Sequence, residues 1–115
     1  MPGNRVLECS YRFALRTVAL GRELRKQREL ELAGQLLRSG TSIGANVEEA
    51  QAGFSRREFA AKMGIAAKEA RESLYWLRLI RDSGTRSGVD IDSMIEDATE
   101  LVRLLTAIVH TASKP

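Results

Sequence analysis

Residues 32–50 read LAGQLLRSGTSIGANVEEA, and this stretch decides the fold. Its apolar and small residues recur every three or four positions, as on one face of an α-helix. Glycine, serine and threonine dominate residues 39–45, although an interior glycine costs a helix about 1 kcal/mol relative to alanine. We therefore interpret residues 39–45 as helix whose small side chains let a second helix approach closely. A phosphate-binding glycine-rich loop would need a Gly-Lys-Ser/Thr ending and a preceding strand, and the stretch has neither.

Three other segments have the same helical periodicity. Residues 6–24, 59–77 and 91–112 each place apolar side chains on one face and charged ones on the other. Residues 84–90 form the only clear loop, and the chain has neither sustained β-alternation nor a repeat of 20 to 50 residues. Four helices with short connections predict an all-α fold, an antiparallel up-down-up-down four-helix bundle.

The junction between the second and third helices carries the clearest local signal. Ser55 and Glu58 have the spacing of a capping box, in which each side chain satisfies a free backbone amide. Gly53 fits the left-handed position that often ends a helix. Phe54 and Phe59 occupy the positions of a hydrophobic staple on either side of the cap. After the later loop, Asp90 or Asp92 is expected to cap the fourth helix.

The composition is that of a single water-soluble domain. With 115 residues, 43% hydrophobic and 29% charged, the chain is expected to form one domain over residues 1–115. No apolar run approaches the roughly 18 residues of a membrane span, and charges interrupt the N-terminal segment, so we expect a cytoplasmic protein. Cys9 is the only cysteine, which excludes a disulfide within the chain and a thiolate zinc site.

Positive charge is concentrated in the first and third helical regions. Residues 1–28 carry a net charge of +5 and residues 55–83 one of +3, whereas the other two regions are acidic. Arg5, Arg12 and Arg16 gather on the side of the first helix opposite its apolar face. Of the 18 basic residues, 14 are arginines, which pair bidentately with phosphate or carboxylate. The pattern indicates an acidic partner, although a solvated surface would carry similar charges.

The third helix carries a second seam besides its core-facing one. Its members are Ile65, Glu69, Glu72, Trp76 and Leu79. A monomeric bundle needs one seam, and aromatic residues are enriched at the centres of interfaces, so this face is a candidate subunit interface. The alternative is a wide core that covers both seams.

No set of residues predicts catalysis or a metal site. Dinuclear carboxylate sites in bundles need two Glu-x-x-His motifs, and the chain has a single histidine. Glu69 and Glu72 could hold a metal or act as acid and base, but pairing with arginine or lysine is the preferred interpretation. Arg103 and His110 resemble the loose signature of helical HEPN ribonucleases, although Leu104 stands where that family has a polar residue. We therefore predict a non-enzyme without cofactor or metal.

Polar residues at the end of the second helix are expected to have structural roles. Asn46 is interpreted as fixing the helix register through bonds across the bundle, and Glu49 as pairing with an arginine.

A resemblance to a known family rests on the run from Gln35 to Ala50 and on several motifs that follow it. These motifs are Phe59, GIA at 64–66, KEARE at 68–72 and YWL at 75–77. Together they resemble the bacterial four-helix-bundle family of 23S rRNA intervening-sequence proteins, which is similar to the accessory variability determinant of diversity-generating retroelements. The likeness spans residues 6–112 and is densest over residues 35–80. Gly40 departs from it, since the family more often has alanine there.

The resemblance implies a non-catalytic homopentameric ring, and no catalytic residues carry over. For the retroelement relatives it implies a positively charged assembly that binds RNA and a reverse transcriptase. The candidate RNA-binding residues are Arg5, Arg12, Arg16, Arg22 and Lys26. The second seam would then be the subunit interface. An adaptor for a reverse transcriptase or another RNA enzyme is the alternative function, and a HEPN-like ribonuclease is a third.

Overall fold

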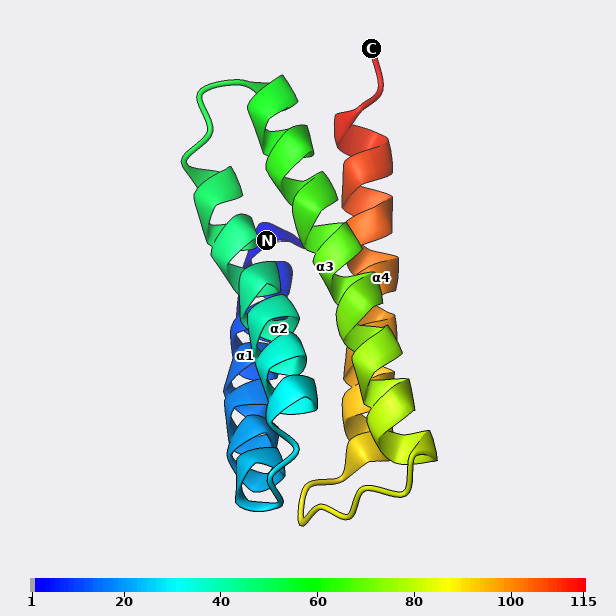
Figure 1. The fold of residues 1–115 in the computed structure, drawn as a ribbon. Helices are drawn as coiled ribbons and strands as arrows, with labels where there is room; N and C mark the ends of the chain where they lie inside the picture. Colours follow the sequence, from blue (N-terminus) through cyan, green and yellow to red (C-terminus); the bar gives the residue numbers. More distant parts are fainter. Residues whose placement is uncertain (1) are drawn as a thin grey trace.

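The computed structural model describes residues 2–115 and contains four α-helices (Figure 1). They are α1 (Pro2–Lys26), α2 (Leu30–Gln51), α3 (Arg56–Asp82) and α4 (Ile91–Ala112). Each helix runs antiparallel to the one before it, and the bundle measures 47 × 21 × 20 Å. The predicted all-α, up-down-up-down four-helix bundle is therefore confirmed. None of the described helices is long and apolar enough to cross a lipid bilayer.

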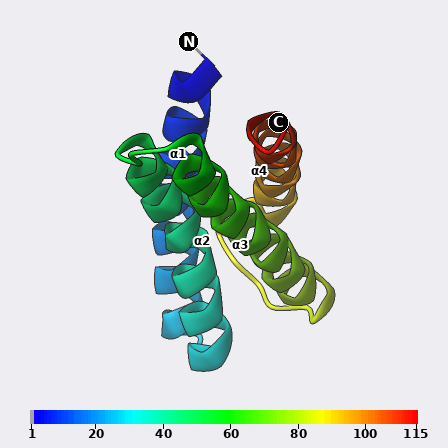
Figure 2. The same ribbon diagram turned by 90° about the horizontal axis from the view of Figure 1, so that it is seen from above.

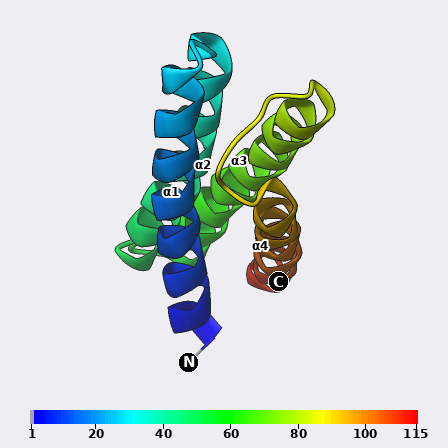
Figure 3. The ribbon, with the colours of Figure 1, turned by 90° about the horizontal axis from the view of Figure 1, so that it is seen from below.

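Helices that are consecutive in the chain are also neighbours in space. Within the described residues α2 packs on α1 and α3, and α3 packs on α4, while the backbones of the diagonal pairs do not approach each other closely. The contact between α1 and α4 is the smallest of the four. Figures 2 and 3 show the reason, because α3 is inclined to the α1–α2 pair and carries α4 away from α1. The bundle is thus least tightly closed along the α1–α4 side.

The core is aliphatic, as the low aromatic content requires. Phe13 is its one fully buried aromatic side chain, and all four helices contribute leucine, isoleucine, valine, methionine or alanine. Burying one large apolar side chain contributes about 1.5–3 kcal/mol to folding. Besides Phe13, the largest side chains buried in the core are Leu20, Leu24, Leu36, Ile43, Met63, Leu77, Ile80, Met94, Leu101 and Leu105.

The small residues of α2 form a close helix crossing, as predicted. Gly40 lies against Thr17 of α1, so a Cβ built on this glycine would be 2.9 Å from the Thr17 Cβ and would overlap its methyl group. One turn later, a Cβ on Gly44 would lie 3.4 Å from the Ser10 carbonyl oxygen. The contact with Thr17 requires glycine at position 40, whereas a Cβ at position 44 would make an ordinary van der Waals contact; both bring the two backbones together.

A buried serine pair joins α2 to α3 on the other side of the same segment. The Ser73 hydroxyl donates to the Ser39 hydroxyl at 3.0 Å, and Ser39 donates in turn to the Leu36 carbonyl at 3.3 Å. Within the described residues, every buried side-chain nitrogen and oxygen has a hydrogen-bond partner. The pair therefore satisfies two polar groups where a larger side chain would separate the helices.

The predicted serine cap is present, but the reciprocal bond of Glu58 is with the residue before the cap, and the predicted staple is wrong. The Glu58 amide donates to the Ser55 hydroxyl at 3.1 Å, and the Glu58 carboxylate accepts from the Phe54 amide at 2.7 Å. Phe59 packs against the core, whereas Phe54 is 98% exposed. The turn directs Phe54 away from the helix that it precedes, so the two rings do not meet.

The backbone is left-handed at other residues than Gly53, where the sequence predicted it. Ala52, with φ −93°, caps the C-terminus of α2, and Gly53 does not have a positive φ. The residues with positive φ are Gly84, at 79° after α3, and Arg28, at 63° between α1 and α2. The predicted loop over residues 84–90 is confirmed, since α3 ends at Asp82 and α4 begins at Ile91. The Asp90 cap is confirmed as well, since Asp90 accepts from the Ser93 amide at 3.0 Å.

Candidate nucleic-acid and subunit interfaces

The predicted basic face of α1 is divided, because two of its arginines turn toward α4. Arg16 contacts the Asp97 carboxylate and donates to the Ser93 hydroxyl at 3.2 Å. Arg5 lies 3.3 Å from the Glu100 carboxylate. These side chains bridge the sparsely packed α1–α4 side. Much of the positive charge of Arg5 and Arg16 is therefore already paired within the bundle.

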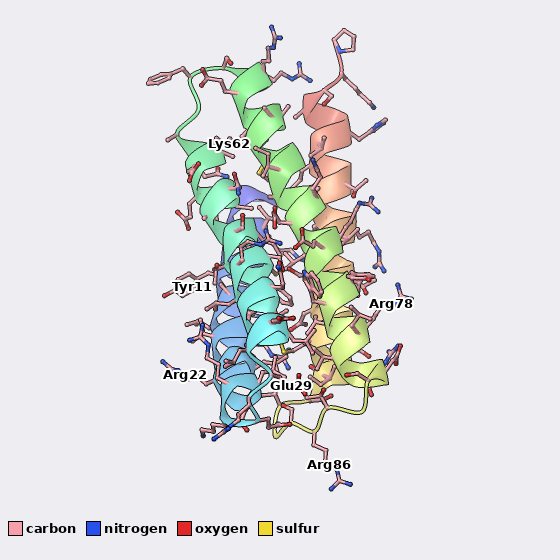
Figure 4. All side chains as sticks on the ribbon, viewed as in Figure 1. Tyr11, Arg22, Glu29, Lys62, Arg78 and Arg86 are labelled. Carbon is pink, nitrogen blue, oxygen red and sulfur yellow. The ribbon has the colours of Figure 1, made fainter. Side chains whose placement is uncertain are left out.

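The other three predicted RNA-binding residues are exposed to solvent. Arg12 and Arg22 have no ion pair within 4.0 Å among the described residues, and Lys26 lies 3.6 Å from Glu23. In Figure 4, Arg22 projects from α1 on the side opposite Arg78 of α3. The structure thus separates the five predicted residues into a paired group and a free group rather than one continuous stripe.

Further cations join Arg22 and Lys26 at the end of α1. Arg25 and Arg28 are exposed there. The Gln27 side chain donates a hydrogen bond to the Arg86 carbonyl, and this bond ties the α3–α4 loop to the end of α1. Figure 4 shows Arg86 on that loop. Cations near a helix C-terminus are favourable in themselves, because the helix dipole is negative at that end. We call the following set the basic end: Arg22, Arg25, Lys26, Arg28 and Arg86.

The basic end was only partly predictable. Within the described residues, Lys26 is its one member with an ion pair, so four cations remain free. The sequence prediction missed Arg86 because 59 positions separate it from Gln27. A run of basic residues from 22 to 28 was the available signal for the other members.

The end of α3 nearby is electrically more balanced. Arg81 donates to Asp82 at 2.8 Å and lies 3.8 Å from Asp92. The hydrogen bond from Arg81 lowers the pKa of Asp82, because it stabilises the ionised carboxylate. Positive charge is therefore in excess on the α1 side of this end.

The predicted second seam of α3 is also split. Glu69 and Glu72 face Arg38 of α2, which lies 3.2 Å from Glu69 and also contacts the Glu72 carboxylate. The Trp76 indole donates to Glu72 at 2.9 Å, and the ring is half-buried against the core. Pairing of the two glutamates with an arginine is thus confirmed. Within the described residues, no group of three or more histidine, cysteine, aspartate or glutamate side chains could hold a metal ion.

The ends of this seam remain open to solvent. Ile65 and Leu79 are exposed, and neither belongs to the core. The wide core is thus only partly realised, because the bundle partly buries Trp76 and leaves the aliphatic ends exposed. Which surface covers them in an assembly stays a prediction.

A groove opens beside Trp76, between the start of α2 and the last turns of α3. It encloses about 450 Å³, and we call it the α2–α3 groove. The side chains that define it are Glu29, Leu30, Glu31, Gln35, Arg38 and Trp76. It is an apolar hollow with carboxylates along its rim.

The residues behind the ribonuclease hypothesis lie on an exposed face of α4. Arg103 donates to Glu100 at 3.0 Å, and His110 is exposed. Between them Thr106 accepts a hydrogen bond from Arg71 of α3 at 3.3 Å. The arginine is thus held by a neighbouring carboxylate, as on an ordinary charged surface.

Two structural predictions for the end of α2 are corrected. The Asn46 side chain donates to the Ser42 carbonyl at 2.9 Å and so bonds within its own helix, not across the bundle. Glu49 pairs with Lys62 of α3 at 2.8 Å rather than with an arginine. Helical spacing of four residues makes the local Asn46 bond available, and a lysine is the cation that α3 presents there.

The fold and these surfaces define a small all-α bundle with segregated surface charge. The family model described as 23S rRNA-intervening sequence protein matches residues 3–107. A solved structure of a protein of unknown function from the S23 ribosomal protein family of Bacteroides thetaiotaomicron is 41% identical, with a TM-score of 0.89. The match covers 96% of this chain and 99% of that one. The chain therefore belongs to the 23S rRNA-intervening sequence protein family. A comparison with curated proteins finds no match.

Proposed function

We propose that this protein is a non-catalytic, homo-oligomeric RNA-binding bundle of the cytoplasm and that the basic end contacts RNA phosphates. The observation that carries the proposal is the gathering of five cations from α1, the α1–α2 turn and the α3–α4 loop. Four of them have no ion pair among the described residues. The family description refers to 23S rRNA, which supports structured RNA as the ligand.

Arginine-rich surfaces of this kind suit phosphate. A guanidinium forms two parallel hydrogen bonds to a phosphate and remains charged at every physiological pH. One copy of the basic end would bind weakly, since the whole chain has a net charge of only +3. A ring of copies, five according to the family resemblance, would present the same cations repeatedly to one RNA.

The experiment is equilibrium binding of a labelled structured RNA to purified, nuclease-treated protein at about 50 and 200 mM salt. We expect affinity to fall by tens-fold or more between the two salt concentrations, because several phosphate contacts release counterions together. Absence of binding at low salt would contradict the proposal and favour the protein adaptor.

A pair of variants separates the basic end from general charge. Arg25→Glu with Arg86→Glu reverses two cations of the basic end, and we expect RNA affinity to fall at least tenfold. Lys68→Glu with Arg78→Glu makes the same change in net charge on exposed residues of α3. We expect this control to retain most of the affinity. An equal loss in both variants would show that RNA responds to total charge and not to the basic end.

A further inference from the structure

The outer face of α1 carries apolar side chains that the bundle does not use. Tyr11 is 64% exposed and Leu15 is 55% exposed, and Ala19 continues the row one turn later. We call these three residues the outer stripe. Figure 4 shows Tyr11 projecting away from α3, on the same side of the bundle as Arg22. A contiguous exposed apolar row on a small water-soluble domain marks an interaction surface.

Positive charges flank the outer stripe. Arg12 and Arg22 lie at its edges, and neither forms an ion pair within 4.0 Å among the described residues. Glu8 lies on the same face, so the two arginines leave one positive charge in excess. A partner surface that fits the stripe should therefore be apolar and negatively charged.

The α2–α3 groove has this complementary character. Leu30 is 63% exposed at its edge, and Trp76 forms part of its wall. Glu29 and Glu31 add carboxylates. The positive charge of Arg38 does not balance them, because the carboxylates of α3 described above already pair with it. The groove is thus an apolar hollow in which negative charge exceeds positive.

We propose that the outer stripe of one copy docks into the α2–α3 groove of a second copy of this chain. Tyr11 and Leu15 would cover Leu30 and Trp76, and the flanking arginines would face Glu29. An aromatic side chain buried in this way removes about 150–250 Å² from water. One copy cannot satisfy both surfaces itself, because Tyr11 projects away from α3, whose Trp76 forms part of the groove (Figure 4).

The docking is heterologous, since each copy presents two different surfaces. Contacts of this type repeat from copy to copy and close into a ring when the rotation allows. The inference rests on the oligomeric part of the proposed function and names its interface. The sequence predicted an interface on α3 but not the surface that it contacts. The docking assigns that surface to α1 of the neighbouring copy.

The first test is the mass in solution, measured by light scattering at micromolar concentration. Wild-type protein should be an oligomer, and Leu15→Glu should lower its mass to the 12.7 kDa protomer. Phe54→Glu is the matched control, because it introduces the same charge at an apolar residue that is 98% exposed. Phe54 lies in the α2–α3 turn, at the end of the bundle away from the groove. It should leave the mass unchanged, and both variants should retain the helical circular dichroism of the wild type.

The second test exchanges the charges of the two surfaces. Arg12→Glu with Arg22→Glu, and separately Glu29→Arg with Glu31→Arg, should each abolish the oligomer. Mixing the two variants should restore association into species in which the variants alternate, with an even number of copies. In these species a negative stripe meets a positive groove and a positive stripe meets a negative one.

Different failures have different meanings. An oligomer that persists in Leu15→Glu, or a mixture that stays monomeric, overturns the docking alone. A wild-type protein that is monomeric overturns the oligomeric part of the proposed function as well. RNA binding by the basic end is measured separately, with the charge-reversal variants of the proposed function.

Discussion

Single atoms decide how closely α1 and α2 approach. Gly40 faces the buried Thr17 side chain at the crossing, and even one added carbon overlaps it. Ser39 and Ser73 similarly keep α2 and α3 together through hydroxyl groups that bond to each other. The family that the sequence resembles more often has alanine in place of Gly40. Thr17 is therefore the feature that makes glycine necessary in this chain.

Gly40→Ala should therefore destabilise the protein despite the higher helix propensity of alanine. We expect a loss of about 1–3 kcal/mol in the free energy of unfolding, measured with urea, because the new methyl group overpacks the crossing. Gly64→Ala is the control, since a Cβ on Gly64 meets nothing within 4 Å and should stabilise α3 slightly.

The partner variant makes this prediction specific. Thr17→Ala removes the methyl group, which overlaps most, so the double variant Gly40→Ala with Thr17→Ala should lose less stability than the two single losses added together. Strict additivity would show that the crossing is not where the methyl group acts.

At His110 we predict no catalytic role. The wild-type protein should leave labelled RNA intact, and His110→Ala should behave identically in gel assays of cleavage. Cleavage by the wild type that disappears in His110→Ala would instead support general acid–base chemistry by this residue.

At the scale of helices, local pattern predicted most of what the structure contains. The periodicity of residues 32–50 and the cap at Ser55 are local features, and both are confirmed. Periodicity also showed which side of α1 is outside the core. It could not show that α4 offers acids to Arg5 and Arg16, because that depends on how distant helices pack. The exposure of Phe54 was missed for the same reason, since the direction of a turn depends on both helices.

The cap of α3 yields a prediction for one element. Ser55→Ala removes the acceptor of the Glu58 amide and should cost about 0.5–2 kcal/mol in the free energy of unfolding. Ser55→Asp keeps an acceptor at the N-terminus and should retain most of the stability. Thermal melts followed by circular dichroism compare the two variants, and equal melting temperatures would contradict a role for the cap.

At the scale of the whole molecule, the two proposed surfaces have different functions. The basic end would meet RNA, and the outer stripe would meet the next copy, with Arg22 at the boundary between the two surfaces. The candidate interface on α3 could be predicted from its apolar spacing, whereas the α2–α3 groove could not, because α2 and α3 build it jointly. The sequence does contain the outer stripe, as three apolar residues spaced four positions apart. Arginines lie between them, so the sequence analysis interpreted this side of the helix as basic.

Assembly and RNA affinity should therefore be coupled. Leu15→Glu leaves every member of the basic end intact, yet we expect RNA affinity to fall at least tenfold, because the copies no longer bind one RNA together. The dependence of affinity on salt should also become shallower, as fewer phosphates are contacted at once. Unchanged affinity and salt dependence in a monomeric Leu15→Glu variant would show that one copy suffices.

The nearest-neighbour packing of the helices also has a kinetic consequence. Apart from the small α1–α4 contact, each helix packs only on those that precede and follow it in the chain. Such a protein has a low contact order, and loop closure contributes little to its folding barrier. We expect refolding in the range of microseconds to milliseconds. During synthesis, α2 can dock on α1 as soon as it leaves the ribosome, before α3 and α4 have been made.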